Sequence, residues 1–319
     1  MGRAVNLVVS CTNRKRYETA SGLTAHRLVG ADVQARLKTW KERLSAAPEE
    51  KYPAEELYMG EHWSVVRDIV AVAGDQGWDV RLWICSAGYG LIRPTARIHS
   101  YQVTFASGTR DSVSAWEDNA ARKWWKGVCS YAIAGERGVP RSLTKLALEY
   151  PRTPMLVALS ADYLNAVEED LLSVLSHEYF HRHLAIVSCG TNRQASHWKK
   201  NLLPCDGSVS ASLGGTLTSL NARVARFLLQ SSVPTDPTVA HWSALVGSLE
   251  RETTARPSRT PQSDAEVSSF IRTALKLVPN ASRSKLLEEF RTSGKACEQK
   301  RFGELYVRLK QEAGPEVHG

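Results

Sequence analysis

The sequence contains no long apolar run. No stretch of the 319-residue chain reaches about 18 consecutive apolar residues, the length that a membrane-spanning helix needs. The apolar run in the N-terminal stretch MGRAVNLVVSCTNRKR is too short for a secretory signal and instead predicts a first β-strand. We therefore expect a cytoplasmic protein with no membrane partner.

Paired cysteine motifs are also absent. None of the six cysteines forms a CxxC pair, so neither a zinc ribbon nor a thioredoxin-type redox motif is indicated. We expect the cysteines to be reduced rather than joined in disulfide bonds.

The glycine turn in LGGTLTSLNARVARFLLQ (213–230) lacks the GK[ST] ending of a Walker A loop. It predicts a helix capped by Thr216 or Ser219, with free amides facing an anion. An ordinary Gly-Gly loop before a core helix is the alternative.

Acidic residues are outnumbered, with 33 Asp and Glu against 41 Lys and Arg and a formal net charge of +8. This balance favours a polyanionic partner. The cluster Arg14, Lys15 and Arg16 directly follows the first strand, where it is expected to hold phosphates, and Arg223 is expected to assist. A solvated loop is the alternative for the cluster.

Four apolar segments end alike. Each has four or five apolar residues followed by Ser or Cys and then a turn: NLVVSCTN (6–13), RLWICSAG (81–88), MLVALSAD (155–162) and LAIVSCGT (184–191). Such runs fit strands buried on both faces of a parallel sheet. Helical patterns lie between them at 55–77, 113–135 and 161–175. The expected fold is therefore α/β, a mostly parallel sheet flanked by helices.

Composition also predicts the domain organisation. Residues 231–262 are rich in Pro, Ser and Thr, although the patch around Trp242 is expected to pack back onto the first domain. We expect an α/β domain over 1–235, a linker over 236–262 and a small helical module over 263–319.

The C-terminal module resembles a helix-turn-helix pattern whose second helix carries the basic residues Lys300, Arg301 and Arg308. Lys300 and Arg301 are candidate nucleic-acid contacts. Residues 261–319 hold ten Lys and Arg against eight Asp and Glu, so a packing or oligomerisation module is the alternative.

In doubly wound sheets, ligands bind outside the carboxyl ends of the strands. The four polar strand endings are therefore expected to converge on one crevice, although Ser and Gly also occur simply at turns. The candidate pocket residues are Ser10, Cys11, Asn13, Cys85, Ser86, Tyr89, Ser160, Asp162, Ser188, Cys189, Thr191 and Asn192.

A carboxylate is predicted beside this crevice. The stretch YQVTFASGTRDSV (101–113) follows the Tyr89 turn and contains Asp111. Such a carboxylate can act as a general base or stabilise a cation that develops on a sugar. The alternative is that Asp111 caps a helix starting at Ser112 or Val113.

SHEYFHRH (176–183) contains an HExxH motif formed by His177, Glu178 and His181. On one helix face the two histidines would bind zinc, with the glutamate as general base. The apolar segment from residue 184 would end that helix within a turn of His181. A helix end with histidines near its C-terminus is therefore the favoured interpretation, and a zinc hydrolase is the alternative.

The order of the motifs resembles a known family. SCTNRKR, LYMGEHW and ICSAGYGLI are followed by Ile98, Tyr101 and the pair Thr104-Phe105. This is similar to the bacterial peroxide-stress DNA-binding family and its small relatives, which share a strand, the motif LSAKYGLL, and then a Tyr and a Thr-Leu pair. The resemblance covers roughly residues 5–113, with Gly88 in place of the family's Lys. It implies a DNA-associated α/β fold.

The longer chain also resembles phage-defence proteins, some of which are thought to be DNA glycosylases that remove hypermodified bases from viral DNA. The resemblance implies a base flipped out of double-stranded DNA and a reaction that needs no metal or other cofactor. It supplies no catalytic residue, and the GxDP signature of uracil glycosylases is absent.

We therefore expect a DNA glycosylase in antiviral defence. In this hypothesis Asp111 activates water or stabilises the oxocarbenium-like transition state. The base and sugar are positioned by Ser86, Tyr89, Asn13 and Asp162. A non-catalytic DNA- or RNA-binding protein, nucleoside deoxyribosyl transfer and the zinc hydrolase are the alternatives. The sequence leaves the base and the oligomeric state open.

Overall fold

The computed structural model describes residues 3–190, 198–232, 234–251, 259–279 and 281–312. The chain divides into two compact units, residues 1–252 and residues 253–319. Helix α11 (Val239–Gly247) lies in the segment expected to be a linker, yet it belongs to the first unit. Its Trp242 is fully buried, with the ring centroid 6.1 Å from that of Trp78. The first unit therefore extends beyond residue 235.

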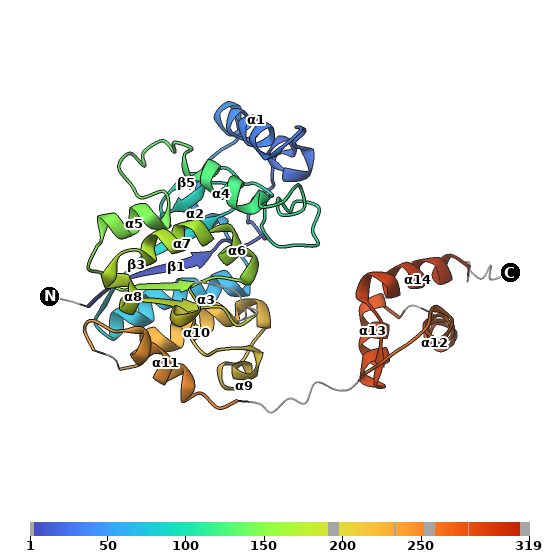
Figure 1. The fold of residues 1–319 in the computed structure, drawn as a ribbon. Coiled ribbons are helices and arrows are strands. Elements are labelled where there is room, and N and C mark those ends of the chain that lie inside the picture. The colour runs from blue at the N-terminus through green and yellow to red at the C-terminus, as the bar shows by residue number, and fades with distance from the viewer. Residues whose placement is uncertain (1–2, 191–197, 233, 252–258, 280, 313–319) are drawn as a thin grey trace. The chain divides into compact units, whose positions relative to one another are not determined.

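The first unit is built on a five-stranded sheet with the order β4-β3-β1-β6-β7 (Figure 1). Four strands run parallel, and β4 is antiparallel to β3. The bounds are β1 Arg3–Ser10, β3 Trp78–Ser86, β4 Gly90–Ile92, β6 Met155–Ala158 and β7 Leu184–Val187. The four parallel strands are the four apolar segments of the sequence, and the predicted α/β fold is confirmed.

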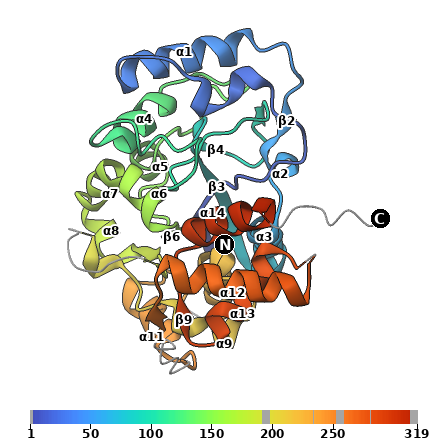
Figure 2. The same cartoon turned by 90° about the vertical axis from the view of Figure 1, so that its right-hand side faces the viewer.

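Helices cover both faces of this sheet, which explains why its strands are almost continuously apolar. One face carries α3 (Glu61–Asp75) and α10 (Leu220–Gln230), with α11 beside α10 (Figure 1). The other face carries α4 Ala120–Cys129, α5 Leu143–Glu149, α6 Ala161–Ala166 and α7 Glu168–Leu175. Helix α1 (Val33–Ala46) packs on α4 (Figure 2).

The sheet reverses its winding direction between β1 and β6. The chain passes from the central β1 to β3 on one side, and only later to β6 on the other side. This is the topological switch point of a doubly wound sheet, the position where such folds bind ligands. The carboxyl ends of β1 and β6 therefore mark the first place to look for a site.

Three predicted helices are shorter than their patterns. The 55–77 pattern is divided into α2 (Ala54–Leu57) and α3, because Gly60 between them has a φ of 96°. The 161–175 pattern is divided into α6 and α7 at Val167. The 113–135 pattern keeps only α4, which follows Asn119 at a φ of 58°. The prediction of one long helix in each of these three stretches was wrong.

Shorter elements complete the first unit. They are η1 Ser21–Leu23, η2 Ala25–Arg27, β2 Tyr52–Pro53, β5 Arg97–Ile98, α8 Glu178–His183, η3 Lys199–Asn201, η4 Gly207–Val209, α9 Ser210–Leu213 and η5 Leu217–Ser219.

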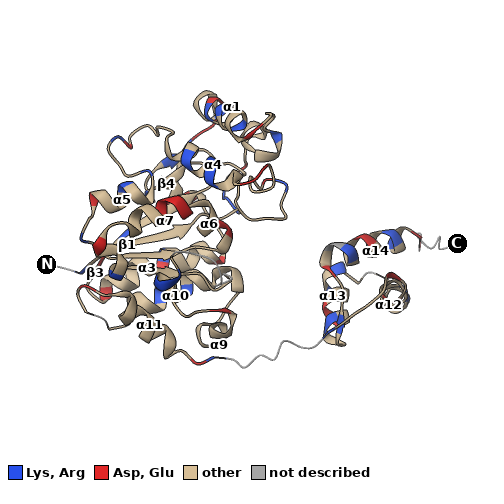
Figure 3. Ribbon diagram, viewed as in Figure 1, with Lys and Arg blue, Asp and Glu red and all other residues tan. Residues whose placement is uncertain are grey.

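The second unit has its own apolar core, which includes the buried Phe290 and Phe302. Its helices α13 and α14 carry both basic and acidic residues (Figure 3). Its elements are β8 Thr260–Pro261, α12 Asp264–Leu277, α13 Arg283–Thr292, β9 Lys295–Ala296 and α14 Gln299–Glu312. Across the described ranges of both units, no helix is long and apolar enough to cross a membrane.

Candidate functional site

Two tyrosine hydroxyls converge on the end of β3. The hydroxyl oxygens of Tyr58 and Tyr101 lie 3.0 Å apart, and that of Tyr101 lies 2.7 Å from Oγ of Ser86. The Tyr58 hydroxyl donates to the same Oγ at 3.3 Å. Burial raises the pKa of both tyrosines well above the ordinary value, so their hydroxyls keep their protons.

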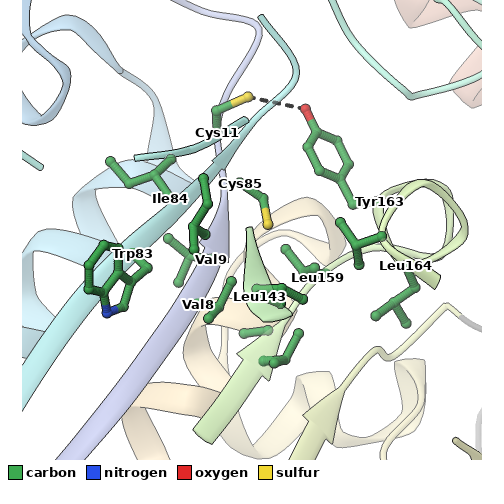
Figure 4. Close-up of a cluster of buried hydrophobic side chains, with 14 of the residues drawn as sticks. Val8, Val9, Cys11, Trp83, Ile84, Cys85, Leu143, Leu159, Tyr163 and Leu164 are labelled. Atoms are coloured by element: carbon green, nitrogen blue, oxygen red, sulfur yellow. Dashed lines mark hydrogen bonds between the residues drawn. The ribbon is translucent and has the colours of Figure 1, made fainter. Parts of the chain in front are cut away.

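Cys11 extends this cluster across the switch point. It is the first residue after β1, and its Sγ lies 3.1 Å from the hydroxyl oxygen of Tyr163, a residue of the helix that follows β6 (Figure 4). The Tyr101 hydroxyl donates to the same sulfur at 3.4 Å. Side chains from the ends of β1 and β3 and from the helix after β6 therefore meet in one cluster. We call Cys11, Tyr58, Ser86, Tyr101 and Tyr163 the tyrosine cluster.

The amine of Lys15 lies against this cluster. Its Nζ is 4.2 Å from the ring centroid of Tyr101 and 5.9 Å from that of Tyr58. The atom is buried and has no hydrogen-bond partner among the described residues, although the side chain as a whole is only half-buried. Burial lowers the pKa of Lys15 to about 8, against the opposing influence of Cys11 and Asp111.

A short backbone bridge fixes this position. Lys15 pairs antiparallel with Tyr58, through a bond of 2.8 Å from the Arg16 N–H to the Leu57 carbonyl. Side chains alternate along an extended segment. Arg14 and Arg16 are therefore exposed, while Lys15 between them turns its amine inward.

Asp111 and His26 form a second feature of this region. Oδ1 of Asp111 accepts a bond from the His26 backbone N–H at 3.1 Å and lies 2.6 Å from its Nδ1. The two side chains are 20% and 23% exposed. In the described part of the chain, the hydrogen bonds to this carboxylate reach only Oδ1.

Backbone bonds hold the Asp111 loop beside Tyr101. The Thr104 N–H donates to the Asp111 carbonyl at 3.0 Å, and Thr24 pairs with Gln102 in a parallel bridge. No helix starts at Ser112 or Val113, so the expectation that Asp111 caps a helix there was wrong. The carboxylate instead binds His26.

The remaining positioning candidates have different surroundings. The Tyr89 hydroxyl accepts a hydrogen bond from the His99 N–H at 3.0 Å. The Tyr89 ring packs against the Tyr101 ring in a T-shaped arrangement, with the centroids 5.5 Å apart, so Tyr89 supports the position of Tyr101. Asn13 is exposed close to Lys15 in the chain. Asp162 is half-buried and accepts weakly from the Ser107 N–H at 3.4 Å.

The other strand-end candidates have different surroundings. The Ser10 carbonyl oxygen lies 3.1 Å from Nε2 of His62, whose pKa is lowered by burial. Cys85 is buried and its pKa is raised by that burial. Ser160 is exposed at the start of α6, Ser188 is buried, and the Cys189 N–H donates to Asn221. Thr191 and Asn192 are outside the described residues.

The predicted anion site before α10 holds the chain's own glutamate. The carboxylate of Glu61 accepts from the Thr216 N–H at 3.2 Å and from the hydroxyls of Thr216 and Ser219. Arg223 is ion-paired with the same carboxylate. Glu61 therefore occupies the place that the sequence suggested for a phosphate.

In the second unit, Arg301 is ion-paired with Asp264 at 2.5 Å and also binds the Gln262 carbonyl. The side chain of Lys300 is outside the described residues.

The HExxH motif does not form a helical metal site. His177 is the residue before α8, with extended backbone, and only Glu178 and His181 lie on that helix. All three side chains are exposed. Among the residues that the structure describes, no group of three or more His, Cys, Asp or Glu is arranged to hold a metal ion. The geometry therefore gives the zinc alternative no support.

A cavity of about 340 Å³ lies between α4, α5 and α7. Glu169 and Asp170 line it, and Asp170 already accepts bonds from Trp125 Nε1, the Leu143 N–H and the Thr144 hydroxyl. Among the described residues, no side chain in this lining has a buried polar atom without a hydrogen-bond partner, in contrast to Lys15. We therefore place the candidate site at the carboxyl ends of β1 and β3.

Sequence reasoning about the crevice missed three of its members. His26, Tyr58 and Tyr163 were not site candidates, and Tyr101 entered only through the family resemblance. Tyr58 lies in the quoted motif LYMGEHW, which was the available signal. Neither a family model, a curated protein nor a solved structure matches the chain. The resemblance to the peroxide-stress family stays an expectation.

Proposed function

We propose that the protein is a cytoplasmic DNA glycosylase that cleaves the N-glycosidic bond of a modified base in phage DNA. The observation that supports this most is the position of Asp111. Its partly exposed carboxylate lies next to His26, within electrostatic range of the buried Lys15 amine. Together they form an acid-base arrangement beside the switch point of the sheet.

The arrangement suits a reaction at a sugar carbon. Cleavage of an N-glycosidic bond develops positive charge on the sugar, and a nearby carboxylate stabilises that charge. In this proposal Oδ2 of Asp111 has that role, and His26 holds the carboxylate through Oδ1. The buried hydroxyls of Tyr58, Tyr101 and Ser86 hydrogen-bond to one another, and the proposal requires them to exchange these bonds for bonds to the base and sugar.

Exposed arginines lie next to these groups in the chain. Arg14 and Arg16 flank Lys15, Arg27 follows His26, and Arg110 precedes Asp111 and contacts Nε2 of His26 through its guanidinium. Guanidinium groups bind phosphate oxygens well, and such contacts fix a protein on DNA without reading its sequence. They supply the DNA contact that the net charge of +8 suggests.

The test uses purified protein with phage DNAs that carry natural base modifications and with unmodified DNA. Abasic sites are detected as strand breaks after alkali treatment. We expect breaks in one modified DNA, and Asp111→Asn should lower their rate by about 10²–10⁴-fold, the usual contribution of a positioned acid or base. Asp118→Asn, an exposed carboxylate nearby in the chain, is the control and should keep the rate.

Intact DNA in every sample, with salt-sensitive retention in a gel shift, would instead indicate a non-catalytic binding protein. Turnover of free nucleosides at a rate independent of salt would indicate deoxyribosyl transfer.

A further inference from the structure

We propose that Lys15 is the nucleophile of this site and forms an imine with C1′ of the target sugar. The inference rests on the proposed glycosylase function and adds a covalent step to it. It also changes the role of Lys15, which the sequence suggested as a phosphate contact.

Geometry separates Lys15 from an ordinary basic residue. Buried charged groups in proteins are normally paired or hydrogen-bonded, because an unpaired one is costly. The Nζ of Lys15 is buried without a hydrogen-bond partner among the described residues, and it faces the Tyr101 ring at 4.2 Å. Its two neighbours, Arg14 and Arg16, are exposed and are therefore better placed than Lys15 to contact solvent or phosphate.

The location fits a reacting group. The Lys15–Tyr58 bridge holds the backbone of Lys15 at the carboxyl edge of the sheet, beside Cys11 at the end of β1. Asp111 lies close enough to act on the charge of the amine. Only a neutral amine attacks carbon, and burial lowers the pKa of Lys15 to about 8, so a useful fraction is neutral near physiological pH.

The step balances without an added oxidant or reductant. The lone pair of Nζ forms a bond to C1′, and the bond from C1′ to the base nitrogen breaks with its electron pair leaving on the base. The nitrogen then loses a proton, and the base takes one up. Opening of the sugar breaks the C1′–O4′ bond, O4′ gains a proton, and C1′ is left as a protonated imine. Water later releases the lysine and the aldehyde of an abasic site.

The test uses an oligonucleotide with a preformed abasic site, so it does not require knowledge of the base. Its aldehyde condenses with an amine to the same imine with loss of water, and borohydride reduces that imine to a stable amine. The full-length protein is incubated with this duplex and borohydride, the covalent adduct is quantified on a denaturing gel, and the modified lysine is mapped by mass spectrometry.

We expect the adduct to map to Lys15. Lys15→Met and Lys15→Arg should each lower its yield at least tenfold, whereas Lys126→Met, which removes an exposed lysine of α4, should not. Lys15→Arg keeps the charge, so a merely electrostatic role would leave the yield unchanged. Mapping in the wild-type chain gives the answer even if a variant folds poorly.

The outcomes separate the inference from the proposed function. Release of a modified base without any adduct at Lys15 would overturn the inference and leave a glycosylase that uses water directly. An adduct at Lys15 without base release from any DNA would remove the glycosylase proposal and the base displacement, and would leave Lys15 as an imine-forming amine for existing abasic sites. Adducts spread over several exposed lysines would overturn the inference, because they require no built site.

Discussion

At the residue scale, the buried amine of Lys15 should cost stability. Its pKa of about 8 in the folded chain, against 10.5 for an ordinary lysine, means that folding disfavours the charged form. Replacing Lys15 by methionine keeps a chain of similar length and removes the charge. We expect Lys15→Met to raise the free energy of unfolding at pH 7 by up to about 3 kcal/mol, measured by urea denaturation.

The pH dependence of this difference has a definite sign. Between pH 8 and 10.5 the unfolded chain holds the Lys15 proton and the folded chain does not, so the wild type gains stability relative to Lys15→Met as pH rises. Below pH 8 both states are protonated and the full cost remains. A difference that stays constant from pH 7 to pH 10 would contradict the lowered pKa.

Some residues of the candidate site could be predicted from the sequence, and others could not. Lys15 was recognisable as a basic residue directly after the first predicted strand, and Asp111 as a carboxylate in the loop that follows the Tyr89 turn. His26 and Tyr163 were not, because each meets its partner across a long stretch of chain, 85 residues from His26 to Asp111 and 152 from Tyr163 to Cys11. Periodicity reports neighbours along one element and carries no information on such contacts.

At the element scale, the turn after β3 positions Tyr101. A Cβ added at Gly88 would lie 2.7 Å from two ring carbons of Tyr101, closer than such atoms approach. The Trp40 Nε1–H also donates to the Gly88 carbonyl at 2.8 Å, which restricts any shift of the turn.

We therefore expect Gly88→Ala to lower the free energy of unfolding by about 1–3 kcal/mol and to reduce trapping of abasic DNA, because Tyr101 is displaced. The control is Gly74→Ala on α3, where nothing lies within 4 Å of the added Cβ. That change should leave trapping intact. Equal trapping by the two variants would show that the position of Tyr101 does not matter.

Elements differed in how well they could be predicted. Strands β1, β3, β6 and β7 were recognisable because burial on both faces leaves only short, continuous apolar runs. The helix boundaries were not, since Gly60 and Asn119 break patterns whose apolar spacing continues past them. The anion site before α10 was predicted, but not that the distant Glu61 of the same chain occupies it.

At the scale of the whole molecule, helix α11 completes the first unit. Trp242 is fully buried and packs near Trp78 at the start of β3. We expect Trp242→Ala to lower the free energy of unfolding by about 3–5 kcal/mol, as for other fully buried aromatic residues. The measurement is urea unfolding of the full chain, with Trp242→Phe as a control that should cost much less. A negligible loss for the alanine variant would mean that α11 is not part of the core.

The tyrosine cluster joins parts of the chain that lie far apart in sequence. Cys11, Tyr58, Tyr101 and Tyr163 follow or flank different strands, and Tyr163 is 152 residues from the sulfur it meets. Closing loops of this length costs entropy before any contact repays it, so such pairings form late in folding. Tyr163 reaches Cys11 only once β6 has joined β1, so a newly synthesised chain lacks the complete tyrosine cluster until the parallel sheet has formed.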